Sequence, residues 1–155
     1  MDDRAVARLG TPDLRIAGFQ LWVHGYEFPD SEHSWDGNWL RVTAHCGAAG
    51  ASVWVGGALL DTVSVLRFRR GLATLFQMLQ GEAALASHEP NVLVRVTAAD
   101  RTGHLTVRVE LTPDQLAQGH RFNFEADQTY IPELIAACDA LLVRLPVRDP
   151  AGRGV

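Results

Sequence analysis

The sequence predicts an α+β fold built as a two-layer sandwich. We expect one antiparallel sheet of about six to seven strands, with two amphipathic helices packed on one of its faces. The clearest strand segments alternate apolar and polar residues, which is typical of antiparallel sheets with one face in water. Two other segments repeat apolar residues at three- and four-residue steps, as one face of a helix does. Strands and helices do not alternate one for one, which argues against a doubly wound parallel sheet.

The first strands follow a polar segment, residues 1–13, which we expect to form a loose N-terminal arm. In the first strand, Phe19 lies on the apolar face while Trp22 and His24 lie on the polar face. A segment rich in turn-forming residues then separates this strand from the next. We predict strands at residues 19–26, 39–46 and 52–55, with a further extended piece at 59–63.

The first helix is predicted from an apolar stripe, with Ser64 placed to cap its start and Gly81 to close its end. Its other face carries arginines, among them Arg67 and Arg70, which we interpret as a solvated face rather than a phosphate site. The stripe consists of Val65, Phe68, Leu72, Leu75, Phe76 and Leu79.

The second half repeats this order of strands followed by a helix. Residues 91–98 and 104–112 alternate on both sides of a turn and form the best hairpin in the sequence. Weaker strand signals lie at 83–88 and around Phe122 and Phe124. Thr129 is predicted to cap the second helix, which tolerates Pro132 in its first turn and stops at Pro146. Its apolar stripe is Leu134, Ile135, Cys138, Leu141, Leu142 and Leu145.

Length and composition predict a single globular domain, residues 14–148, followed by a frayed C-terminal tail at 149–155. The chain has 155 residues, of which 47% are apolar and 21% charged, as in an ordinary globular protein. It has no signal-peptide pattern and no apolar run long enough for a membrane helix, so we expect a cytoplasmic protein that binds no membrane. In that compartment Cys46 and Cys138 are expected to stay reduced. Nothing requires a stable oligomer, and we expect a monomer or a weak homodimer.

The charges exclude some functions and disfavour others. All 14 basic residues are arginine, so a Schiff-base lysine and a phosphate-binding P-loop lysine are absent. The formal net charge is −4, which argues against a nucleic-acid binder. No nucleophile, dinucleotide-binding or zinc-protease motif is present. We therefore expect no enzymatic activity and no cofactor.

Two weaker chemical interpretations were weighed. His24 and His45 lie on the polar faces of neighbouring strands, and His33 lies in the loop between them, so the three could hold zinc. Their spacing does not bring them together locally, and scattered surface histidines explain them better. His88-Glu89 with Asp127 would form an acid–base pair, but no nucleophile motif accompanies them. We expect no metal site.

The most distinctive local feature is the loop between the first two strands. It carries four acidic residues and no Lys or Arg, together with exposed-looking aromatic residues. Acidic residues interleaved with aromatic ones form a suitable surface for a basic protein partner, because aromatics act as anchors and charge speeds association. We predict Trp39 to fold back onto the core. The predicted binding residues are Glu27, Asp30, Glu32, Trp35 and Asp36.

Five short strings, in this order and at similar spacings, resemble the WapI-type immunity proteins that accompany polymorphic, contact-dependent bacterial toxins. The resemblance covers about residues 14–148 and implies a cytosolic antitoxin without catalysis of its own. Such a protein binds and blocks a cognate toxin domain, often a nuclease, by stoichiometric protein–protein interaction. The strings are Gly25-Tyr-Glu-Phe-Pro29, Asp36-Gly-Asn-Trp-Leu40, His88-Glu-Pro-Asn91, Asp127-Gln-Thr-Tyr130 and Pro146-Val-Arg148.

An alternative function is a small-ligand-binding or regulatory module without catalysis. Such a module would use the solvated face of the sheet. The residues expected to line that face are Trp22, His24, Arg41 and Arg108.

Overall fold

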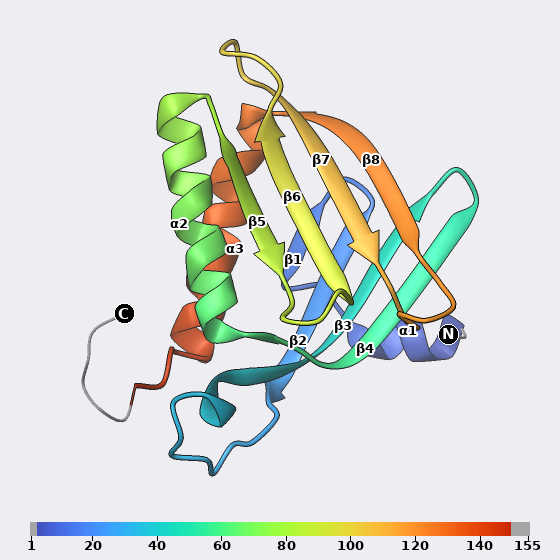
Figure 1. The fold of residues 1–155 in the computed structure, drawn as a ribbon, viewed down its shortest axis with the longest axis vertical. Helices are drawn as coiled ribbons and strands as arrows, with labels where there is room; N and C mark the ends of the chain where they lie inside the picture. The colour runs from blue at the N-terminus through green and yellow to red at the C-terminus, as the bar shows by residue number, and fades with distance from the viewer. Residues whose placement is uncertain (1–2, 150–155) are drawn as a thin grey trace.

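The computed structural model describes residues 3–149 and contains two four-stranded antiparallel sheets and three α-helices within that range (Figure 1). The first sheet has the order β1 (Leu14–Ile16), β2 (Phe19–Tyr26), β3 (Trp39–Ala48) and β4 (Ala51–Asp61). The second has the order β5 (Glu82–Ala86), β6 (Val92–Ala98), β7 (His104–Leu111) and β8 (His120–Asp127). The helices are α1 (Asp3–Leu9), α2 (Thr62–Met78) and α3 (Ile131–Arg144), with 3₁₀ turns η1 (Asp36–Asn38) and η2 (Gln128–Tyr130).

The α+β class is confirmed, but the prediction of one sheet with six to seven strands is wrong. The two sheets face each other, with β3 against β7 and β8, and β4 against β6 and β7. Each sheet has an apolar face, which is covered by the other sheet together with the two long helices. Alternation along a strand reveals that one face is buried, but it does not reveal which element covers that face.

The two long helices close one side of this sandwich instead of lying across a single sheet. α2 packs against the edge strand β5, α3 contacts the edge strand β1, and the two helices pack on each other (Figure 1). Most of their predicted apolar stripes face the core between the sheets, where Phe68, Leu72 and Leu134 are at most 3% exposed, but Phe76 of the first stripe is 42% exposed. The helices therefore fill the gap between the β1 and β5 edges.

The caps of α2 differ from those predicted. Asp61, the last residue of β4, is the N-cap, and its Oδ1 accepts a hydrogen bond from the Ser64 amide at 2.6 Å. Ser64 is therefore the capped residue rather than the cap. At the other end Leu79 adopts a left-handed conformation and donates its amide to the Leu75 carbonyl, so the helix ends before Gly81.

The start of α3 is also shifted. Asp127 accepts hydrogen bonds from the amide and the hydroxyl of Thr129, so the aspartate caps η2 and Thr129 is the donor. α3 follows directly, with proline in its first turn as predicted. In both cases a carboxylate with two acceptor oxygens takes the capping position that was assigned to a nearby hydroxyl.

The N-terminal segment contains regular structure where a loose arm was expected. Residues 3–9 form α1, and the segment after it lies over the first sheet, where the Gly10 carbonyl accepts from the Trp22 indole at 2.9 Å. Asp13 accepts from the Val23 amide at 2.6 Å. The prediction failed because these contacts join residues distant in sequence. The domain limits 14 and 148 remain a prediction, and the predicted tail lies outside the described residues from 150 onward.

Candidate functional site

The loop of residues 27–38 projects from one end of the molecule, between β2 and β3 (Figure 1, bottom). Asp30, Glu32 and Asp36 are exposed, and the Trp35 side chain is also exposed, at 63%. Glu27 differs from the other four because it is half-buried and forms an ion pair with Arg41 at 3.3 Å. The structure therefore places all five predicted binding residues on one loop, four of them fully available to a partner.

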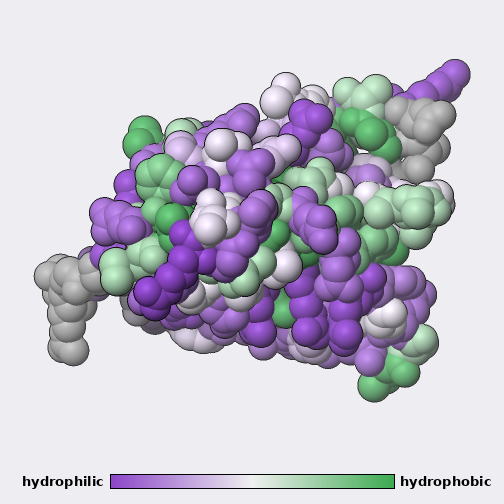
Figure 2. Space-filling model, turned by 90° about the horizontal axis from the view of Figure 1, so that it is seen from above, coloured by the Kyte–Doolittle hydropathy of each residue, from purple (hydrophilic) through white to green (hydrophobic). Residues whose placement is uncertain are grey.

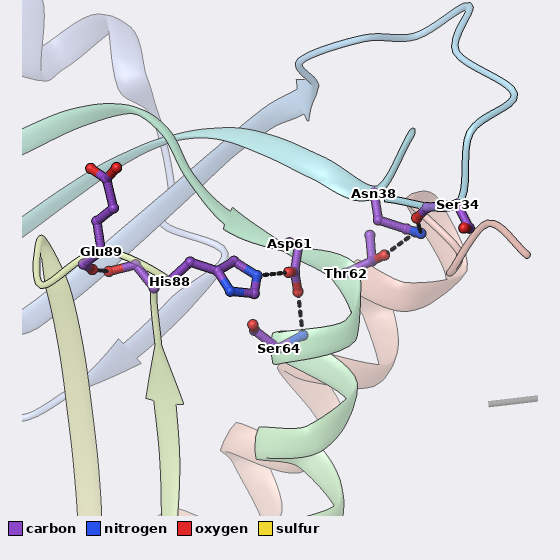
Figure 3. Close-up of polar contacts among 8 residues, drawn as sticks. Ser34, Asn38, Asp61, Thr62, Ser64, His88 and Glu89 are labelled. Atoms are coloured by element: carbon purple, nitrogen blue, oxygen red, sulfur yellow. Dashed lines mark hydrogen bonds and ion pairs between the residues drawn. The ribbon is translucent and has the colours of Figure 1, made fainter. Parts of the chain in front are cut away.

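One buried side chain, Asn38, holds this loop to the rest of the fold (Figure 3). Its Nδ2 donates to the carbonyls of Ser34, at 2.5 Å, and Arg148, at 2.8 Å. Its Oδ1 accepts from the Thr62 hydroxyl at 2.5 Å and from the Arg148 amide at 2.8 Å. Asn38 is only 4% exposed, so a single amide joins the loop, the first turn of α2 and the C-terminal segment.

The C-terminal segment adds a second attachment on the other flank of the loop. The Arg148 guanidinium lies over the Tyr26 ring, 3.6 Å from its centroid, and donates to the Phe28 carbonyl at 3.2 Å. The Tyr26 hydroxyl donates to the Pro146 carbonyl at 2.5 Å. The loop therefore leaves β2 in a fixed direction, because both its beginning and its end are hydrogen-bonded to residues 146–148.

Trp35 is supported by a cluster of aromatic rings. The Trp35 ring packs edge-on against Trp39, with centroids 6.3 Å apart, and both tryptophans contact the ring of His88, at 4.9 and 5.2 Å. His88 Nε2 is bonded to Asp61 Oδ2 at 2.5 Å (Figure 3). Since Asp61 also caps α2, the cluster is connected to the start of that helix. Trp39 is half-buried, consistent with the prediction that it folds back.

His88, Glu89 and Asp61 are the residues of this region that the sequence analysis did not place beside the loop. The one available signal was the set of five strings, because four of them meet here: 25–29, 36–40, 88–91 and 146–148. The fifth, 127–130, lies at the opposite end of the second sheet. Strings far apart in sequence thus build one end of the molecule.

The weaker chemical interpretations lack a site in the structure. His24 is hydrogen-bonded to Thr43 and His45 to Ser52, and within residues 3–149 no group of three or more His, Cys, Asp or Glu is arranged to hold a metal ion. His88 is bonded to Asp61, whereas Asp127 lies at the far end of β8, so the acid–base pair is not assembled.

The face expected to bind a small ligand is divided between two sheets. Trp22, His24 and Arg41 belong to the first sheet, whereas Arg108 lies on β7 of the second, where it pairs with Glu110. Trp22 is 5% exposed and stacks on Trp54, so it is not available as a liner. On α2, Arg69, which lies next to the predicted solvated residue Arg70 in sequence, is ion-paired with Asp139 of α3 at 2.8 Å, which favours a structural role for this arginine.

The opposite end of the molecule is mainly hydrophilic, with apolar residues in small separate groups (Figure 2). It contains a hollow of about 450 Å³ lined by His104, Glu125, Asp127 and Tyr130, among others. His104 Nδ1 is bonded to Asp100 at 2.6 Å, and this hydrogen bond and the carboxylate charge raise the pKa of His104. The hydrogen bonds from Thr102 and His104 hold the pKa of Asp100 well below its usual range. Tyr130, one of the residues that line the hollow, is 48% exposed, compared with 63% for Trp35.

The loop of residues 27–38 is thus acidic, is anchored on both flanks, and carries one exposed tryptophan, Trp35. Such a combination of a charged rim and an aromatic anchor is typical of surfaces that bind proteins. No helix in the described part of the chain is long and apolar enough to cross a membrane.

The family model described as "Immunity protein WapI-like family" matches residues 12–146. The chain therefore belongs to the WapI-like immunity protein family, which confirms the resemblance and supports an immunity function. No curated protein matches the chain. Among solved structures, a chain of the "CdiA-CT/CdiI toxin and immunity complex from Enterobacter cloacae" is similar at 9% identity, over 65% of this chain and 88% of that chain, with a TM-score of 0.41.

Proposed function

We propose that this protein is an immunity protein that binds and blocks a cognate bacterial toxin domain, in the cytoplasm, through the loop of residues 27–36. It acts by stoichiometric protein–protein interaction and catalyses no reaction. The observation that carries the proposal is Trp35, whose side chain is 63% exposed on an anchored loop that also carries the exposed Asp30, Glu32 and Asp36. Family membership supports the immunity function.

The charge of the loop supports a basic partner, and a nuclease is the class of toxin that fits best. A nuclease holds a polyanionic substrate with Lys and Arg, so its active-site groove is a basic surface. An acidic loop can occupy such a groove and exclude the nucleic acid, and opposite charges speed the encounter. The loop brings four carboxylates from residues 27–36 with no Lys or Arg between them.

The experiment has two stages. The tagged chain is first used to capture its partner from the native host, and the captured toxin domain is then produced separately. In the second stage the chain is titrated against that domain while its nuclease activity and the complex stoichiometry are measured. We expect inhibition that is complete at a 1:1 ratio and no turnover of the toxin or its substrate.

A charge-reversed variant with Lys at 27, 30, 32 and 36 tests the location of the surface. The matched control reverses four exposed acids elsewhere, Glu82, Asp114, Glu125 and Glu133, so that both variants have the same net charge. We expect the loop variant to lose inhibition and the control to retain most of it. Equal inhibition by the two variants would show that the loop is not the binding surface.

A further inference from the structure

We propose that the toxin-binding surface extends from the loop onto the second sheet, through His88 and Glu89. In this arrangement Trp35, held in place by His88, is the platform on which an arginine or lysine side chain of the toxin lies. The inference rests on the proposed function, because it names the partner group that the loop receives.

The first argument is that Trp35 is supported on one side and free on the other. Its ring contacts Trp39 and His88, with centroid distances of 6.3 and 4.9 Å, yet its side chain remains 63% exposed. A tryptophan that only completed a core would be covered by its neighbours. Here the neighbours fix the ring while leaving most of it open to a partner.

The second argument is that His88 is itself immobilised. Asp61, which is 7% exposed, uses one carboxylate oxygen to cap α2 and the other to bind His88 (Figure 3). His88 therefore holds the exposed Trp35 ring in a fixed position relative to the start of α2. An anchor that is ordered before binding loses less conformational entropy when the complex forms, which favours tight binding.

The third argument is the charge around the platform, which selects a cation. Within residues 27–39 and 87–90 there are five acidic residues and no Lys or Arg: Glu27, which is paired with Arg41, and Asp30, Glu32, Asp36 and Glu89. Beside His88 lies a hollow of about 260 Å³ lined by Glu89, Pro90 and Glu110, among others. The face of an indole ring attracts a guanidinium or ammonium group, and nearby carboxylates strengthen that attraction. The same charges would repel a nucleic-acid phosphate.

The test measures the dissociation constant of the complex with the toxin domain produced as described above, by calorimetry. We expect Trp35→Ala to weaken binding about 30-fold or more, the size of a hot-spot effect. Trp35→Phe, which keeps a smaller aromatic face, should recover part of this loss. His88→Gln, whose amide can still donate to Asp61, should weaken binding about fivefold to tenfold, and Glu89→Lys should weaken it and reduce its salt dependence.

A double-mutant cycle separates positioning from a general structural effect. If His88 acts by holding Trp35, then His88→Gln has almost no further effect once Trp35 is alanine. Full additivity of the two changes would overturn the positioning role, as would unchanged binding by His88→Gln. Thermal unfolding of each variant is measured in parallel to show that the variant folds. If His88→Gln does not fold, Trp35→Ala provides the test. Normal binding of the toxin domain by a folded Trp35→Ala variant also overturns the inference.

The cation is tested from the toxin side. Each exposed Lys and Arg of the toxin domain is changed to Ala, and we expect one of them to be coupled to Trp35 in a second double-mutant cycle. If no toxin residue is coupled, the platform does not receive a cation. Failure of the proposed function looks different, because then the wild-type chain does not inhibit the toxin or the four-lysine loop variant inhibits it normally.

Discussion

Replacing Asn38 with alanine should destabilise the protein more than its position in a surface loop indicates. The side chain makes four hydrogen bonds, to Ser34, to Thr62 and two to Arg148. Alanine removes all four. We expect the C-terminal segment to detach from the loop and the start of α2 to lose a buried contact.

The size of the expected loss in stability depends on whether each hydrogen-bond partner of Asn38 can bind water once the side chain is removed. A typical hydrogen bond contributes about 0.5–1.5 kcal/mol net to stability, whereas a buried group left without a partner costs about 1–3 kcal/mol. The Thr62 hydroxyl would be a buried group without a partner, because this residue is only 1% exposed. Water can reach the backbone groups of Ser34 and Arg148, which reduces their share. The sum is a loss of about 3 kcal/mol in the free energy of unfolding, or about 6–12 °C in the melting temperature of a chain of this size.

Urea unfolding monitored by tryptophan fluorescence and by circular dichroism measures this loss. Asn123→Ala is the matched control, because Asn123 is an exposed residue on β8. Asn38→Asp keeps the acceptor oxygen but sets a second carboxylate oxygen against the Ser34 and Arg148 carbonyls, so at neutral pH it should destabilise the protein at least as much as alanine. If Asn38→Ala costs less than about 1 kcal/mol, or no more than the control, the side chain is not the junction described here.

Three further predictions concern other parts of the fold. Gly18→Ala should lower the unfolding free energy by about 1–3 kcal/mol, because the new Cβ would lie 2.2 Å from the Gly47 carbonyl oxygen, and an unchanged urea midpoint would contradict this close approach. His104 should titrate above its ordinary pKa in an NMR experiment, and Asp100→Asn should lower that pKa. Because the folded-state pKa is raised, this pair stabilises the protein below the ordinary histidine pKa, and the contribution is lost as pH rises through the raised value; a His104 that titrates at or below its ordinary pKa would refute the pairing. Burial raises the pKa of the Cys138 thiol to about 12, so a thiol reagent at pH 8 should modify the protein only after unfolding, and rapid reaction of the native protein would count against that burial.

Periodicity predicted the elements well because each depends on a local pattern. The strand at 19–26 and the helix with its stripe from Val65 to Leu75 appear where they were expected. The segments 52–55 and 59–61 are parts of one longer strand, β4, whose pairing with β3 shifts register at Leu40/Arg41, whereas residues 62 and 63, which were also expected to be extended, begin α2. A bulge of this type interrupts the alternation without ending the strand, so the pattern is divided in two.

The caps were misassigned for a related reason. Ser64 and Thr129 are hydroxyl residues of the type that caps helices, and both are involved in a cap, but as donors to Asp61 and Asp127. A carboxylate two or three residues upstream competes for the same backbone amides. Composition indicates that a helix begins there, while the geometry of the preceding strand decides which oxygen reaches the amide.

The binding loop was recognised from sequence because its composition is locally unusual, with acids, aromatics and turn-forming residues in one stretch. The residue that supports it was not recognised, because His88 follows Trp35 by more than 50 residues and lies in the connection between β5 and β6 of the other sheet. His88 was instead paired in the sequence with Asp127, which the structure places at the opposite end. The role of the loop in binding remains a proposal.

The α+β class, the strands and helices with clear periods, and the family of the chain can be recognised from the amino-acid sequence, because they depend on local patterns and short strings. The pairing of the strands into two facing sheets and the meeting of four strings at one end are visible in the folded protein alone. The same is true of the contacts by which Asn38 holds the loop and His88 supports Trp35. Those features depend on which buried faces cover each other and on hydrogen bonds between residues far apart in sequence. Neither kind of contact produces a repeating pattern of residues in the sequence.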